Sequence, residues 1–194
     1  SMIDKYYNGV IEQVYNRVGK TERNIVMASY NNDFSIENLE MIKRYQENDD
    51  SVFFTWHEFG YRELTGAYEP FLDTICDMFR KYRDGDFDTF LTECGVYELH
   101  REVFRSYYEN GICEREEGVL LNEVEYEQGR MTEAIAAMLK ALAKTHPIVL
   151  VINRFQMASR SAFELVYALI TNPDPNIGLV LGVNDSVGRW ESIA

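Results

Sequence analysis

The chain has 194 residues, 46% of them hydrophobic, which is enough to bury one good core. Its formal net charge of −13 argues against a nucleic-acid or membrane-surface binder, because neutralising phosphates requires clustered Lys and Arg. No apolar run approaches the ~20 residues that a membrane span needs, and the N-terminus has no signal-peptide pattern.

The cysteines indicate the compartment. They are odd in number, widely spaced and without a CxxC motif or zinc-finger spacing: Cys76, Cys94 and Cys113. We interpret them as reduced thiols and expect a cytoplasmic protein. Ser1-Met2 is typical of a cloning remnant, and the end at Ala194 within a helix-like pattern indicates a fragment of a longer protein. Residues 3–194 are expected to form a single domain.

The first element in the chain is a predicted amphipathic helix over residues 3–18. Gly19-Lys20-Thr21 follows and has the letters of the end of a phosphate loop. That motif needs a preceding strand and a glycine five residues before Gly19, where this chain has Val14. The spacing therefore predicts a turn without a phosphate site.

Residues 24–29 predict the first strand, and a helix is expected from about residue 36, capped by Ser35 or Asp33. A phosphate loop would lie in such a strand–loop–helix context. The loop contains no glycine and no lysine, so its backbone N–H groups cannot readily surround a phosphate. Asp33 near the helix start would also repel a triphosphate.

Residues 51–56 predict the second strand, which is aromatic and β-branched. His57-Glu58 follow it and are interpreted either as a general base or metal pair, or as the solvated start of a loop. A helix is expected from Pro70 to about Tyr82.

Residues 84–127 differ in composition, with thirteen acidic residues against three arginines. Their apolar content is too high for a disordered acidic tail, so we expect an insertion of two or three short helices. Its acidic face is either a solvated surface or a docking surface for a basic partner.

The remaining elements alternate again. Residues 130–145 predict a helix, residues 148–152 a buried strand, residues 158–170 a helix and residues 177–183 another buried strand. The predicted fold is therefore α/β: a three-layer, doubly wound parallel sheet of about four strands with an acidic helical insertion.

This order of elements resembles the P-loop NTPase module of the STAND/AAA type, over roughly residues 6–185. In that family the Walker B strand ends in two acids followed by a short continuation that contains Q and A. Here the hydrophobic run 148–152 is followed by Asn153-Arg154 and then F-Q-M-A, so the Q and A match and both acids are missing. The Y-x-P-F motif of residues 68–71 and Asn184, at the sensor position, also resemble the family.

The resemblance implies where a nucleotide site would lie. The Walker A position falls on residues 29–36, a degenerate loop whose candidate residues are Ser29, Asn32, Asp33 and Ser35. Asn153 and Arg154 stand at the degenerate Walker B end, with Asn184 as a sensor-like residue. The motifs for phosphate and magnesium are lost together, so we expect no catalytic residue, no metal ligand and no cofactor, with ATP and magnesium disfavoured. Arg154 is expected to pair with Asp33 or Asp185.

These observations favour a non-catalytic, NTPase-like sensor or interaction domain of a cytosolic signalling or transcription-regulatory protein. Its expected partners are proteins or further domains of the same chain, with no nucleic acid and no membrane. In the family a fifth strand lies beside the Walker A strand, and its apparent absence suggests an open edge at residues 25–28 and a homodimer. Two alternatives remain: a domain that binds ATP or ADP without efficient hydrolysis, with Tyr30 supporting the base, and an unrelated α/β enzyme using His57, Glu58 and Asp185.

Overall fold

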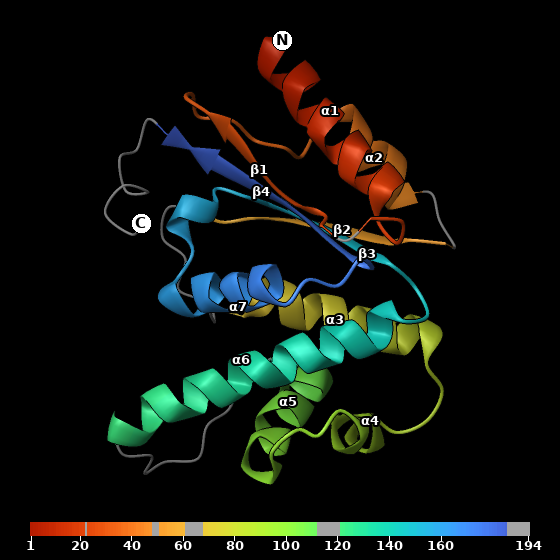
Figure 1. Cartoon of the computed structure of the whole chain (residues 1–194), viewed down its shortest axis with the longest axis vertical. Coiled ribbons are helices and arrows are strands. Elements are labelled where there is room, and N and C mark those ends of the chain that lie inside the picture. The colour runs from red at the N-terminus through yellow and green to blue at the C-terminus, as the bar shows by residue number, and fades with distance from the viewer. Residues whose placement is uncertain (22, 48–50, 61–67, 112–120, 186–194) are drawn as a thin grey trace. The chain divides into compact units, whose positions relative to one another are not determined.

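A computed structural model of the chain describes residues 1–21, 23–47, 51–60, 68–111 and 121–185, without the side chains of residues 121–128. The chain divides into two compact units. Residues 1–65, 143–159 and 172–194 form one, called here the sheet unit, and residues 66–142 and 160–171 form the other, called the helical unit. Each is described separately (Figure 1).

The sheet unit contains four parallel strands in the order β1-β4-β3-β2. They are β1 (Ile25–Tyr30), β2 (Phe53–Glu58), β3 (Ile148–Asn153) and β4 (Ile177–Asn184). The expected α/β class with a parallel sheet of four strands is confirmed. Each strand ends one or two residues later than predicted, so Tyr30, Glu58, Asn153 and Asn184 are the last residues of strands.

Helices α1 (Met2–Arg17) and α2 (Glu40–Glu47) cover one face of this sheet (Figure 1). The helical spacing of Tyr7, Ile11 and Val14 places these side chains on one side of α1, where all three are buried. They pack with side chains of alternating strand positions, because successive strand residues point to opposite faces. This core includes Ala28, Tyr30, Phe54, Val149, Val151 and Val180.

The predicted start of the second helix is wrong. Helix α2 begins at Glu40, and residues 36–39 form a turn-containing loop instead of the first helical turn. Neither Ser35 nor Asp33 caps it. Asn8 of α1 accepts a hydrogen bond from the Met41 backbone N–H at 3.0 Å, so a residue more than thirty positions away supplies the cap.

The turn expected at Gly19-Lys20-Thr21 is present after α1. Gly19 has a φ of +81°, in the region that glycine favours, and its N–H donates to the Pro175 carbonyl. The turn therefore ties the end of α1 to the start of β4 and holds no phosphate loop.

The helical unit contains α3 (Glu69–Tyr82), α4 (Phe87–Glu93), α5 (Glu98–Asn110), α6 (Leu121–Ala143) and α7 (Arg160–Thr171). The acidic stretch 84–127 falls within it as the short helices α4 and α5 and the start of α6, with residues 112–120 outside the described part. Helix α6 begins nine residues before the predicted residue 130. The core of this unit combines aliphatic and aromatic side chains, and the ring of Phe87 stacks on that of Tyr108 with centroids 4.3 Å apart.

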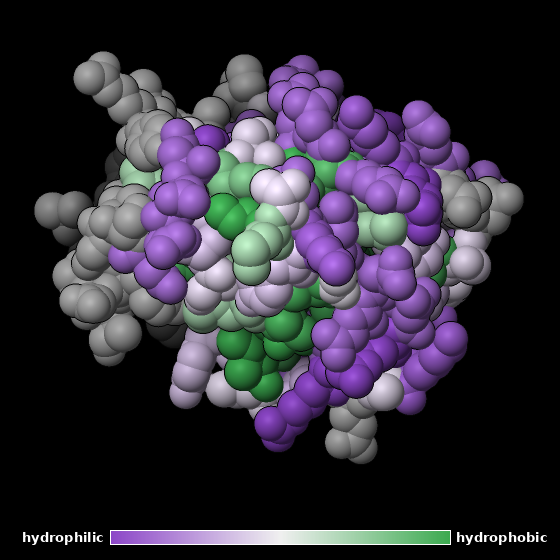
Figure 2. Space-filling model, turned by 90° about the horizontal axis from the view of Figure 1, so that it is seen from above, coloured by the Kyte–Doolittle hydropathy of each residue, from purple (hydrophilic) through white to green (hydrophobic). Residues whose placement is uncertain are grey.

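Cys76 and Cys94 form no disulfide bond, and Cys113 lies outside the described residues. None of the described helices is long and apolar enough to cross a membrane. Seven large hydrophobic side chains among the described residues are exposed: Met2, Tyr6, Met27, Tyr97, Leu99, Tyr167 and Ile170. Figure 2 shows hydrophobic areas on a face that is otherwise mostly hydrophilic.

Candidate functional site at the carboxyl end of the sheet

Asn153, the last residue of β3, is the centre of a buried hydrogen-bond network and has no exposed surface. Its Oδ1 accepts hydrogen bonds from the hydroxyls of Tyr30 at 2.6 Å and Tyr7 at 3.3 Å. Its Nδ2 donates to the Phe34 carbonyl at 2.9 Å and to Glu58 Oε2 at 2.7 Å. Both ends of the amide are therefore fully used, and the side chain joins α1, β1, β2 and the loop after β1.

Glycine at position 182 makes room for this network. Gly182 lies on β4 opposite Ala28 of β1, so two small residues are adjacent. A Cβ at Gly182 would collide with the Tyr7 hydroxyl and with Asn153 Oδ1. The small residue is needed because the hydroxyl of Tyr7, a buried residue of α1, lies over Gly182 where it bonds to the Asn153 amide.

Glu58, the last residue of β2, closes the loop that follows β1. Its Oε2 accepts from the Ile36 backbone N–H at 2.9 Å, and its Oε1 accepts from the Ser35 hydroxyl at 2.8 Å. A backbone N–H and a hydroxyl at this place are the type of donors that a bound phosphate would use. Here the Glu58 carboxylate accepts both of these hydrogen bonds, so the two donors of the loop already bind an anionic side chain.

Arg154 completes the cluster with a positive charge. Its Nη2 lies 3.3 Å from Asp33 Oδ1 and its Nη1 lies 3.6 Å from Glu58 Oε1. The pairing with Asp33 expected from the sequence is confirmed, and Glu58 is a second partner that the sequence did not indicate. Arg154 has a left-handed backbone with a φ of 55°, uncommon for a residue other than glycine. This bend separates β3 from the short 3₁₀ helix η1 (Phe155–Met157).

The tyrosine hydroxyls of the network keep their protons over the ordinary pH range. Burial raises the pKa of Tyr30 to about 12, although the nearby Arg154 charge acts in the opposite direction. Burial, followed by the neighbouring Tyr30 and Glu58, holds the pKa of Tyr7 well above its usual range. Both tyrosines therefore act as neutral donors to Asn153.

The sensor-like Asn184 and the matching Gln156 also meet. The Asn184 backbone N–H donates to Gln156 Oε1 at 3.1 Å, and both residues are buried. The Gln156 Nε2 atom is buried without a hydrogen-bond partner. The Q of the motif at residues 155–158 therefore anchors η1 to the end of β4.

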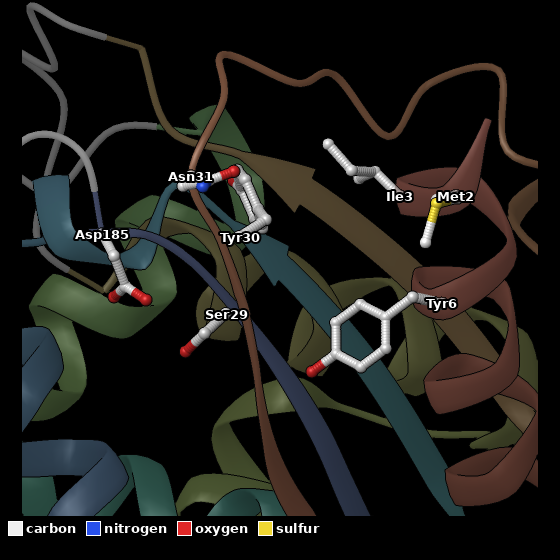
Figure 3. A pocket seen from close by; sticks show the side chains of 7 residues that line it. All are labelled: Met2, Ile3, Tyr6, Ser29, Tyr30, Asn31 and Asp185. Atoms are coloured by element: carbon white, nitrogen blue, oxygen red, sulfur yellow. The ribbon is translucent and has the colours of Figure 1, made fainter.

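Ser29 lies elsewhere, in an open pocket of about 350 Å³ beside the end of β1 (Figure 3). The pocket is lined by Met2, Ile3 and Tyr6 of α1, Ser29, Tyr30 and Asn31 of β1 and its following loop, and Asp185 after β4. Asn32 is an exposed residue of the same loop. The candidate loop residues therefore lie in two places. Asp33 and Ser35 join the Asn153 network, whereas Ser29 faces this pocket.

The arrangement does not bring His57, Glu58 and Asp185 together as one site. His57 and Glu58 are successive strand residues, so their side chains point to opposite faces of the sheet. Asp185 follows β4, which is separated from β2 by β3, a distance of roughly 10 Å across the sheet. The His57 ring packs against Phe59 with centroids 4.8 Å apart. Among the described residues, no group of three or more His, Cys, Asp or Glu side chains could hold a metal ion.

Sequence reasoning therefore missed the residues on which the cluster depends: Glu58 as the acceptor, Tyr7 and Tyr30 as donors, and Gly182 as the space. The partner of Glu58 could not be read from the sequence, because only the pairing of β2 with β3 places Glu58 beside Asn153 and the following Arg154. Comparison of the chain with family models, with curated proteins and with solved structures gives no match.

Proposed function

We propose that this chain is a non-catalytic, NTPase-like interaction domain of a cytosolic signalling or regulatory protein. The observation that carries the proposal is the position of the Glu58 carboxylate. It holds the Ile36 N–H and the Ser35 hydroxyl, the donors that a phosphate would need, and it pairs with Arg154.

The strand order supports the resemblance from which this proposal starts. The strand before the candidate phosphate loop, β1, lies beside β4, which carries the sensor-like Asn184. At the end of β3, where the resemblance expects a metal-binding acid, Asn153 uses its whole amide for internal hydrogen bonds. A neutral, saturated amide offers little to a magnesium ion. The strand order thus supports a scaffold of this kind, and the hydrogen bonds of Asn153 support a domain without magnesium-dependent chemistry.

The alternative of nucleotide binding without hydrolysis has less support. Tyr30 was its candidate for stacking on a base, but Tyr30 is 6% exposed and its hydroxyl is committed to Asn153. Its ring also packs against those of Tyr7 and Phe34, which leaves little of its surface for a base.

A thermal-shift titration with ATP, ADP and GTP, each with and without magnesium, tests the proposal. A ligand at a hundredfold excess over its Kd would add about 2.7 kcal/mol to the free energy of unfolding. In a chain of this size that corresponds to a rise in Tm of roughly 5–10 °C. We expect no rise with any of the nucleotides, and a saturable rise would establish the nucleotide-binding alternative instead.

A further inference from the structure

The outer edge of β1 has the properties of an interface. In the described part of the chain β1 pairs with β4 only. The Asn24 carbonyl accepts from the Leu179 N–H of β4, so the backbone groups of Asn24 and of every second residue after it point toward β4. Ile25, Met27 and Ser29 therefore direct their N–H and C=O groups away from the sheet. Unpaired edge groups of this kind are a template for another strand.

This edge also lacks the usual protection. Residues 25–30 contain no charged side chain and no proline, which are the common means of blocking an edge strand. Among the described residues of the sheet unit, the exposed large hydrophobic side chains border this edge. Met27 is 42% exposed on the strand itself, while Met2 at 89% and Tyr6 at 46% lie on α1. Figure 3 shows the Tyr6 ring and Ile3 projecting from α1 toward β1.

The charge distribution identifies a second copy as a suitable occupant. The whole chain carries a net charge of −13, and two acidic surfaces repel each other. Residues 1–30, which supply α1 and β1, contain four Lys or Arg and three Asp or Glu. The segment that supplies this edge therefore carries no net negative charge, so its charge does not oppose the approach of a second copy.

We propose that two copies of this chain form a dimer by pairing β1 with β1 of the second copy, antiparallel and centred on Met27. Ile25 and Ser29 are spaced equally on either side of Met27, so the outward groups of one strand match those of an inverted copy. The two sheets then become one continuous sheet, with the two Met27 side chains adjacent on one face. The exposed flanks of the two α1 helices face each other on the other side.

The register gives a specific charge contact between the copies. It places Arg23 of one copy opposite Asn31 of the other, and Asn31 adjoins Asp185 in the register of β1 and β4. Two strand spacings, roughly 10 Å between Cα atoms, lie within reach of an extended arginine and an aspartate. Within one copy Arg23 and Asp185 are near opposite ends of β1, roughly 25 Å apart along the strand, so they do not meet.

Sedimentation velocity of the whole chain over a wide concentration range tests the dimer. We expect a reversible monomer–dimer equilibrium for the wild type. Met27→Lys places two like charges opposite each other and should raise the dimer dissociation constant by about a hundredfold or more. Tyr167→Lys changes a more exposed hydrophobic side chain, 67% exposed on α7, and should leave the constant unchanged. Circular dichroism of each variant confirms that a loss of dimer is not a loss of fold.

A charge exchange tests the register. Arg23→Glu and Asp185→Arg should each raise the dissociation constant about five- to tenfold, and the double variant should restore it, since the two residues meet only between copies. A wild type that stays monomeric at all concentrations overturns the proposal, as does a dimer insensitive to Met27→Lys. A dimer that responds to Met27→Lys without rescue by the exchange overturns this register. The dimer proposal rests on the proposed function in one respect, that the domain acts by binding protein. The nucleotide titration of the same sample tests the proposed function separately, so either proposal can fail without the other.

Discussion

The side-chain amide of Asn153 donates a hydrogen bond of 2.7 Å to the carboxylate of Glu58, joining the ends of β3 and β2. This contact requires that position 153 be an amide. A carboxylate at the same place would stand against another carboxylate, and the pair would repel unless one of them took up a proton.

Asn153→Asp should therefore lower the free energy of unfolding by about 3 kcal/mol or more at pH 7. In this variant a proton taken up between the two facing carboxylates would relieve their repulsion, so the deficit relative to the wild type should shrink as the pH falls. Urea unfolding at pH 7 and at pH 5 measures both effects. Asn32→Asp, at an exposed position in the same region, is the matched control and should change stability by less than about 0.5 kcal/mol. An equal cost of the two substitutions would contradict the network.

Gly182→Ala should destabilise the protein by about 1–3 kcal/mol, because the added methyl group meets the Tyr7 hydroxyl and the Asn153 amide. Gly9→Ala is the control, since a Cβ at Gly9 of α1 meets nothing within 4 Å and alanine favours the helix. It should stabilise by roughly 0.5–1 kcal/mol. Tyr7→Phe removes the hydroxyl, so the double variant with Gly182→Ala should be more stable than the sum of the two single effects. Strict additivity would show that the hydroxyl does not restrict position 182.

Removing the charge from Glu58 should cost far more than removing it from Asp33, although both carboxylates pair with Arg154. Glu58 is 15% exposed and accepts from Ile36, Ser35 and Asn153, so Glu58→Gln should cost about 2–4 kcal/mol. Asp33 is 65% exposed, and Asp33→Asn should cost less than about 1 kcal/mol. Chemical unfolding of the two variants measures both costs. A larger cost for Asp33→Asn than for Glu58→Gln would show that the ion pair with Arg154, rather than the hydrogen bonds of Glu58 to the loop, contributes most to stability.

Stability should fall at high pH because of the buried tyrosines. The pKa of Tyr30 is raised in the folded state to about 12 from the value of 10 for a free tyrosine. A raised pKa means that the unfolded chain loses its proton first, so the contribution is complete below pH 10 and is lost as the pH rises toward 12. The free energy of unfolding should therefore decline between pH 9 and pH 12, and this decline should be shallower in Tyr30→Phe. An identical slope in the two proteins would mean that Tyr30 titrates normally.

The strands could be predicted because their signal is local. Runs such as I-V-L-V-I at residues 148–152 are apolar, β-branched and bounded by turn residues, and all four lie within two residues of their predicted places. The start of α2 could not be predicted in the same way. Glu58 takes the Ile36 N–H, and Asn8 caps Met41, so contacts from β2 and α1 decide where the helix begins.

The place of the candidate site in the fold could be predicted from the sequence, but the residues that organise it could not. The ends of β1, β3 and β4 were expected to meet, and Asp33, Ser35, Asn153 and Arg154 do gather there. The organising role of Glu58 was missed, because its neighbour His57 suggested a catalytic or metal pair. Only the pairing of β2 with β3 shows that Glu58 lies beside Asn153. The need for Gly182 depends likewise on a tyrosine from another element.

The most direct test of the account follows the Ile36 backbone amide by ¹⁵N NMR during titration with ATP, ADP and pyrophosphate, each with and without magnesium. This N–H donates to Glu58 at 2.9 Å and is the donor that a phosphate would have to capture. We predict that the Ile36 resonance does not move with any of these ligands. A saturable shift of Ile36, together with shifts of the Ser35 and Arg154 resonances, would contradict it and show that a phosphate displaces the internal carboxylate.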